Sequence, residues 1–391
     1  MRYIKLLIFT LLLVQECFSQ DKHEIISKIS LLTPLLKDTR SGISGVSVSE
    51  DALFSGLQKI DWNYESPNTY ENIYYNLKDD TLDYRIFLII AKSAGNSAKN
   101  TSDSFYLLKG YYKLLFVNLA ITNGKITNQI QDRLKYEYTN IFRNLLALRS
   151  AKSFHNYEEF KSCATLSIKY ANELLNSLSF RLKLSNLQRS SLYQLIGETV
   201  YESSFLTEKD SSVINLVLRY LSSSIIEDKT NTFSIDKRAR INKNILNNYT
   251  AAIIDYSKWV ELTQQDNTRK IKEFQRSKYF QSTTHAKGFL VTNPTFPRIV
   301  ELIVCYILIE DYTNVLLWCN KAIISMSEYK TYNLGIDDLI NEHEGKIHFY
   351  KASAYHFQKQ NLLACKELTL AFNLGFNYES CQELRRDIKC K

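Results

Sequence analysis

Residues that interrupt regular secondary structure are scarce in this chain. Its 391 residues include only 11 Gly and 4 Pro. A β-sandwich or β-barrel needs many tight turns, and tight turns depend on these two residue types. Apolar residues make up 45% of the chain and charged residues 23%, as in ordinary globular proteins. The sequence therefore favours a globular fold built mainly from helices.

From Asp103 onward, apolar residues recur at helical rather than alternating spacing, most clearly over 105–121, 138–154 and 158–178. Short polar breaks such as Glu310-Asp311 separate neighbouring stretches, which is typical of antiparallel helix pairs. We therefore expect an all-α array of antiparallel helix hairpins.

The array is expected to occupy residues 103–391. Residues 20–102 are expected to form a less regular N-terminal region, because residues 37–83 hold three of the Gly, one Pro and many Ser, Asn and Tyr.

Two C-terminal segments share a pattern of residues. The stretch "HFYKASAYHFQKQNLLACKELTLAFNLGF" (348–376) places small Ala352 and Ala364 where two helices must approach closely, with Tyr355 beside them and Ala371 near the end. The stretch "RIVELIVCYILIEDYTNVLLWCNKAIISM" (298–326) carries a similar pattern with Tyr306 and a late Ala322, although Ile303 and Val315 replace the small residues.

These segments resemble tetratricopeptide repeats, whose consensus has small residues, a Tyr and a late Ala at matching places. The step from Ala322 to Ala371 is 49 residues, whereas the family repeats about every 34. We therefore predict a tetratricopeptide-like α-solenoid with longer helices or loops. The resemblance implies stacked helix pairs with a concave face that holds a ligand or a partner.

The N-terminus has the layout of a cleaved secretory signal. Arg2 and Lys5 precede an apolar run, and small residues Cys17 and Ser19 stand before a cleavage point at Gln20. Residues 1–19 are therefore predicted to be a signal peptide, and the mature chain to be periplasmic or secreted. A lipid anchor on Cys17 is not favoured, because Glu16 replaces the small residue that lipoprotein signals carry.

The mature chain is expected to lack a transmembrane segment, because no later stretch is long and apolar enough. Loss of the signal changes the formal net charge from +8 to +7. This net charge is small for so long a chain, and an exported protein does not meet nucleic acid in the cytoplasm. We therefore expect no nucleic-acid partner.

Six Cys remain after signal cleavage. An exported compartment permits disulfides, although six Cys in so long a chain are not a dense framework. Cys381 and Cys390 would lie about 13 Å apart on one continuous helix, beyond disulfide reach, and could pair only if that helix ends early. The others lie in apolar helical patterns, where a free Cys acts as a small hydrophobe: Cys163, Cys305, Cys319 and Cys365. The sequence leaves the pairing open.

The strongest charge cluster is the basic segment, residues 264–298, where seven Lys and Arg face only two acidic residues. It is interpreted either as a solvated helix with a long connection or as a binding loop for an anionic partner, since long ordered loops often carry function. Trp62, in the aromatic stretch 62–75, is a second surface candidate. The predicted partner-binding residues are Arg269, Lys270, Lys272, Arg276, Lys278, Lys287 and Trp62.

Catalytic and cofactor signatures are weak or absent. In "HEGKIH", His343 and His348 are five residues apart, which turns them away from each other on a helix, and His348 falls on a core-facing position. Ser44 lies in a Gly-containing loop that is one residue short of a nucleophile elbow. The acidic clusters 79–83 and 337–338 are expected to be solvated. We therefore predict no enzyme activity, no metal site and no cofactor.

The sequence thus favours an exported, non-enzymatic scaffold that binds a protein or peptide. One alternative is carbohydrate binding, because exported starch-binding SusD-like proteins also contain tetratricopeptide units and use aromatic platforms. A further alternative is a hydrolase that uses Asp79, Asp80, Asp83 and His343.

Overall fold

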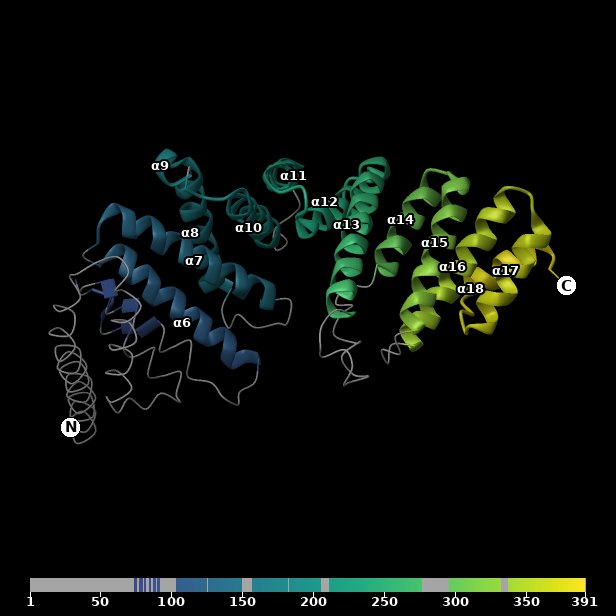
Figure 1. Cartoon of the computed structure of the whole chain (residues 1–391), viewed down its shortest axis with the longest axis horizontal. Coiled ribbons are helices and arrows are strands. Elements are labelled where there is room, and N and C mark those ends of the chain that lie inside the picture. The colour runs from purple at the N-terminus through teal and green to yellow at the C-terminus, as the bar shows by residue number, and fades with distance from the viewer. Residues whose placement is uncertain are drawn as a thin grey trace, which may run out of the picture. The chain divides into compact units, whose positions relative to one another are not determined.

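A computed structural model describes most of the chain from residue 74 onward (Figure 1). The described residues are 74–75, 77–79, 81, 84–85, 87–88, 90–91, 103–124, 126–149, 157–181, 183–204, 211–275, 295–331 and 337–390. They are all-helical and contain no strand. The predicted all-α class is confirmed, and the predicted signal peptide lies outside these residues.

The chain divides into two compact units between Glu208 and Lys209. The helices of the first unit are α6 (Asp103–Thr122), α7 (Asn128–Arg149), α8 (Tyr157–Asn176), α9 (Leu178–Arg181) and α10 (Asn186–Ser204). Within this unit α6 packs on α7, α7 on α8, and α8 on α10, so that neighbours in sequence are neighbours in space.

The core of the first unit is rich in aromatic residues. Phe116, Tyr138 and Phe142 are fully buried, and the Tyr138 ring meets the Tyr170 ring edge to face with centroids 5.2 Å apart. Tyr170 donates a hydrogen bond to Asn118 at 2.7 Å, which satisfies its hydroxyl inside the unit. The described residues between 74 and 91 add buried side chains to this same core, among them Leu77, Phe87, Ile90 and Ala91.

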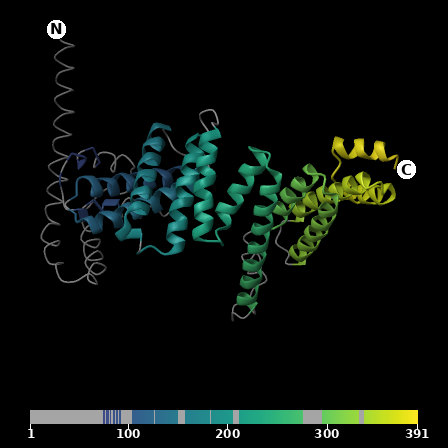
Figure 2. The ribbon, with the colours of Figure 1, turned by 90° about the horizontal axis from the view of Figure 1, so that it is seen from above.

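The second unit contains α11 (Ser211–Glu227), α12 (Thr232–Asn244), α13 (Tyr249–Gln275), α14 (Phe296–Leu308), α15 (Tyr312–Thr331), α16 (Asp337–Phe357), α17 (Asn361–Asn373) and α18 (Glu379–Ile388). Each helix from α11 to α18 packs on the next one along the chain. Figures 1 and 2 show the same succession. The helix pairs α12–α13, α14–α15 and α16–α17 are antiparallel hairpins joined by short turns, as predicted.

Each hairpin turn contains a residue with left-handed backbone: Asn247, Glu310 and Lys359, with φ of 52°, 61° and 60°. Glu310 and Lys359 end α14 and α16 with the same backbone hydrogen bonds, from Asp311 N to Tyr306 O and from Gln360 N to Tyr355 O. Their separation of 49 residues equals the step predicted from sequence. The preceding step, from Asn247 to Glu310, is 63 residues, because α13 is 27 residues long and a long connection follows it.

The 49-residue register also relates buried positions. Val315, Cys319 and Ala322 of α15 correspond to Ala364, Leu368 and Ala371 of α17, and all six are buried. In α17 the small residues Ala364 and Ala371 stand at the two ends of this face, where the helices approach closely, as predicted. In α15 Val315 stands at the place of the first one, and only Ala322 is small.

Ion pairs hold the first hairpin together and connect it to the second. Arg238 of α12 donates two hydrogen bonds to Asp255 of α13, at 2.9 and 2.6 Å. Asp236 pairs with Arg298 across α12 and α14, at 2.5 Å. Lys243 and Glu301 form a second pair between the same two helices. These bridges fix the orientation of successive hairpins in addition to their apolar contacts.

Candidate functional site

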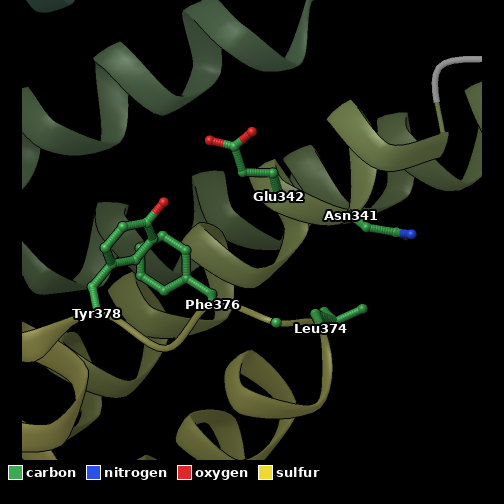
Figure 3. A pocket seen from close by; sticks show the side chains of 6 residues that line it. Asn341, Glu342, Leu374, Phe376 and Tyr378 are labelled. Carbon is green, nitrogen blue, oxygen red and sulfur yellow. The ribbon is translucent and has the colours of Figure 1, made fainter.

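A pocket of about 250 Å³ lies at the corner formed by the start of α16 and the turn between α17 and α18. We call it the corner pocket; it is lined by Asn341, Glu342, Leu374, Gly375, Phe376 and Tyr378 (Figure 3). Its volume is several times the ~30 Å³ that one water molecule occupies in the liquid, so it has room for a side chain of a ligand.

Two glycines account for the path of the turn. Gly375 follows α17 with φ of 82°, a conformation that L side chains rarely adopt. The N–H of Phe376 then bonds to the carbonyl of Ala371 at 3.0 Å and closes the helix end. Gly345 of α16 is the second requirement, because a Cβ there would lie 2.7 Å from the Cβ of Phe376. The turn therefore lies directly on the surface of α16.

Aromatic rings form one wall of the pocket. The Phe376 ring packs against Phe349 of α16 with centroids 5.8 Å apart, and against Tyr378 with centroids 4.6 Å apart. Phe376 is half-buried, whereas Tyr378 is 56% exposed. Tyr378 thus presents most of its ring to solvent from a position that Phe376 supports.

The opposite wall carries a carboxylate. Figure 3 shows the side chains of Glu342 and Asn341 leaving α16 in different directions. Glu342 is exposed, and neither its carboxylate nor the Tyr378 hydroxyl bonds to another residue that the structure describes. Lys346, one helical turn further on, lies 5.9 Å from the Tyr350 ring and does not pair with Glu342. The acidic group of this pocket is therefore available to a ligand.

A buried polar triad behind the turn holds α17 against α16. Glu367 of α17 bonds to His348 Nδ1 at 2.5 Å and to Lys351 Nζ at 2.8 Å, both on α16. Each of the three residues is 9% exposed. Burial by itself raises the pKa of Glu367, but the hydrogen bonds and charges of His348 and Lys351 outweigh it and hold the pKa below its usual range. His348 is therefore a core residue, as predicted, and its partner Glu367 is an acid that also pairs with Lys351.

A disulfide closes the chain segment that carries the pocket turn. Cys365 of α17 bonds to Cys390, which follows α18, so that residues 374–378 and all of α18 lie inside the closed loop. The prediction that Cys365 is a free apolar residue is wrong, because the turn after α17 reverses the chain and brings Cys390 back to α17. Cys390 bonds to Cys365 rather than to Cys381, which is buried and free in α18. Cys163, Cys305 and Cys319 are buried free thiols, as predicted.

Two of the predicted partner-binding residues have described side chains, and they are not among the residues that line the corner pocket. Arg269 and Lys270 are on α13, where both pair with Asp266, at 2.5 and 2.7 Å, and Arg269 also lies 4.0 Å from Glu273. The hydrogen bonds from Lys270 and then Arg269 lower the pKa of Asp266. Lys272 belongs to α13, but the structure does not describe its side chain. The other four predicted residues lie entirely outside the described residues: Arg276, Lys278, Lys287 and Trp62.

The weaker chemical candidates are distributed over different parts of the chain. His343 packs its ring edge to face against Phe296, with centroids 5.1 Å apart. Asp79 is exposed and belongs to the first unit, whereas His343 belongs to the second. Ser44, Asp80 and Asp83 lie outside the described residues. In the part of the chain that the structure describes, no group of His, Cys, Asp and Glu is arranged to hold a metal ion.

Sequence reasoning missed Glu342, Phe376 and Tyr378. The available signal was "NLGF" after the last periodic residue of α17, because a Gly in that place marks a helix end and a change of chain direction. The spacing of residues along the sequence does not predict which residues contact each other across that turn.

No protein-family model matches the sequence, and no curated protein matches it either. None of the described helices combines the length and apolar character required to cross a bilayer.

Proposed function

We propose that the chain is an exported, non-enzymatic binding protein whose helical hairpins hold a protein or peptide partner. The single observation that carries this proposal is the corner pocket, where an exposed aromatic ring on the α17–α18 turn and an unpaired carboxylate on α16 line the same cavity. Exposed Tyr rings on a supported surface are characteristic anchors of protein interfaces, since they offer a large contact area at low entropic cost.

The repeated hairpins support a tetratricopeptide-like array as the scaffold. The 49-residue register of turns and buried positions is the behaviour of stacked repeat units, each of which contacts mainly its neighbours. Such arrays display binding residues along a face while their core is filled by the helices themselves.

Export is supported by two independent features. The first is the predicted signal at residues 1–19. The second is the Cys365–Cys390 disulfide, because disulfides persist in oxidising compartments and are rare in the cytosol.

The experiment that tests the function is crosslinking and affinity capture of the tagged mature chain from its native envelope, read by mass spectrometry. Three baits are compared: the natural sequence, Tyr378→Ala, and Phe233→Ala as a matched control. Phe233 is 50% exposed on α12, so its truncation removes a similar aromatic surface far from the pocket in sequence.

We expect one protein partner that the natural bait and Phe233→Ala recover equally and that Tyr378→Ala recovers at least about tenfold less, as for an interface anchor. Recovery of no partner above an empty bait contradicts the proposal. If a panel of glycans then binds the same chain, the carbohydrate alternative takes its place.

A further inference from the structure

We propose that the corner pocket receives a positively charged side chain, Lys or Arg, of the partner peptide. This inference rests on the proposed function and specifies what the site recognises.

The sign of the charge comes from the pocket lining. Glu342 is the one ionisable acid among the six lining residues, and no Lys, Arg or His is among them. The nearest cation along α16, Lys346, lies over the Tyr350 ring instead. An anionic ligand would meet an uncompensated carboxylate here, whereas an ammonium or guanidinium group would form an ion pair with it.

The aromatic wall favours the same ligand. Aromatic ring faces attract cations placed within about 6 Å of the ring centroid. Tyr378 and Phe376 are two rings in contact and inclined at 60°, so a cation can lie against the exposed Tyr378 ring, whereas the tilted pair forms no flat platform for a planar sugar face. The alkyl part of a Lys or Arg side chain can lie along Leu374, while its charged end reaches Glu342.

One cation of α18 already contacts an aromatic ring outside the pocket lining. Arg385 places its guanidinium over the Phe372 ring, 5.4 Å from the centroid. This same interaction of Arg with an aromatic ring, one turn away in the chain, shows the kind of contact that the pocket rings can make with a guest cation.

The walls of the pocket are fixed before any ligand arrives. The Cys365–Cys390 bond, the close contact at Gly345 and the buried triad of His348, Lys351 and Glu367 hold the turn against α16. A preformed site loses little conformational entropy on binding, so even one side chain can bind measurably.

The test is saturation-transfer NMR of the full mature chain with three probes of similar length: N-acetyl-lysine methylamide, N-acetyl-arginine methylamide and the neutral N-acetyl-norleucine methylamide. The variants are Glu342→Gln, Tyr378→Leu and, as a charge-matched control, Glu261→Gln. Glu261 is an exposed acid of α13 in the same unit. Circular dichroism of each variant checks that the fold is intact, which we expect because Glu342 has no partner among the described residues.

We expect the two cationic probes to bind with dissociation constants in the millimolar range, at least about fivefold tighter than norleucine. Glu342→Gln and Tyr378→Leu should each weaken cation binding about fivefold or more, Glu261→Gln should not, and salt should weaken it through screening. The dissociation constants of the lysine and arginine probes, compared with each other, show which cation the pocket prefers. Equal binding of charged and neutral probes, or unchanged binding in folded Glu342→Gln, overturns the inference.

The two proposals fail in different ways. If the cations bind but no partner protein is captured, the pocket inference stands and the proposed function fails. If a partner is captured equally by natural and Glu342→Gln baits, the function stands and the pocket inference fails.

Discussion

Two groups of charged residues in the second unit show how differently the same residue types behave. At the end of α13, Arg269 and Lys270 are exposed and pair with Asp266 along one helix. At the α16–α17 hairpin, Glu367 is buried between two helices with His348 and Lys351. The first group lies in water, which screens it, and the second is enclosed by protein. The number of charged residues in a segment therefore does not indicate how much each of them contributes to stability.

The corner pocket sharpens this contrast. Glu342 is a single exposed acid with no partner among the described residues, whereas the basic segment contains many charges, of which the described ones are compensated by neighbours. The more available charge is thus the less conspicuous one in the sequence.

The largest expected effect comes from removing the disulfide that closes the segment carrying the pocket turn. Replacing Cys365 and Cys390 together by Ala should destabilise the closed segment by about 3.5 kcal/mol, because a loop of 25 residues loses its chain-entropy constraint. Hydrogen exchange of α17 and α18 amides should accelerate, while exchange in α13 should not change. Uniform acceleration across both regions would show that the disulfide does not act locally.

The buried triad should give the next largest effect. Glu367→Gln leaves Lys351 without its anion, and we expect the α16–α17 hairpin to lose about 3 kcal/mol near neutral pH. The matched control is Glu383→Gln, which removes an exposed acid of α18 and should change stability by less than about 0.5 kcal/mol.

The triad also predicts a pH dependence. The pKa of Glu367 is lower in the folded chain than its usual 4.5, so its stabilisation is complete above that value and is lost as the pH falls through the folded-state pKa. Hydrogen exchange of α17 measured from pH 6 to pH 3 and corrected for intrinsic rates should show this acid-induced loss in the natural chain. Glu367→Gln should show less of it, and an identical pH profile would remove Glu367 as the source.

The smallest effect is expected at the exposed pairs of α13. Arg269→Gln and Lys270→Gln should each change the free energy of unfolding by less than about 0.5 kcal/mol, since exposed ion pairs contribute little. Partner capture should also persist in the double variant. If capture is lost while Tyr378→Ala retains it, the basic segment is the docking site and the corner pocket is not.

Particular elements show which parts of the fold the sequence predicts. Helix periodicity and scarce Gly and Pro were sufficient to predict an all-α array of hairpins, and the spacing of Ala322 and Ala371 gave the 49-residue register, because both depend on local patterns. The 63-residue step before it was not predicted, since the length of α13 and of the connection after it carries no strong local signal.

The sequence by itself determined that the chain forms amphipathic helices in antiparallel pairs, because side chains three and four residues apart share one helix face. Only the tertiary structure decided that Cys365 bonds to Cys390, that Glu367 meets His348 and Lys351, and that Glu342 lines one pocket with Phe376 and Tyr378. Each of these contacts joins residues from different helices, and their distance depends on the turns and on close approaches such as that at Gly345. Spacing along one helix fixes what shares its face, but packing between helices decides which faces meet.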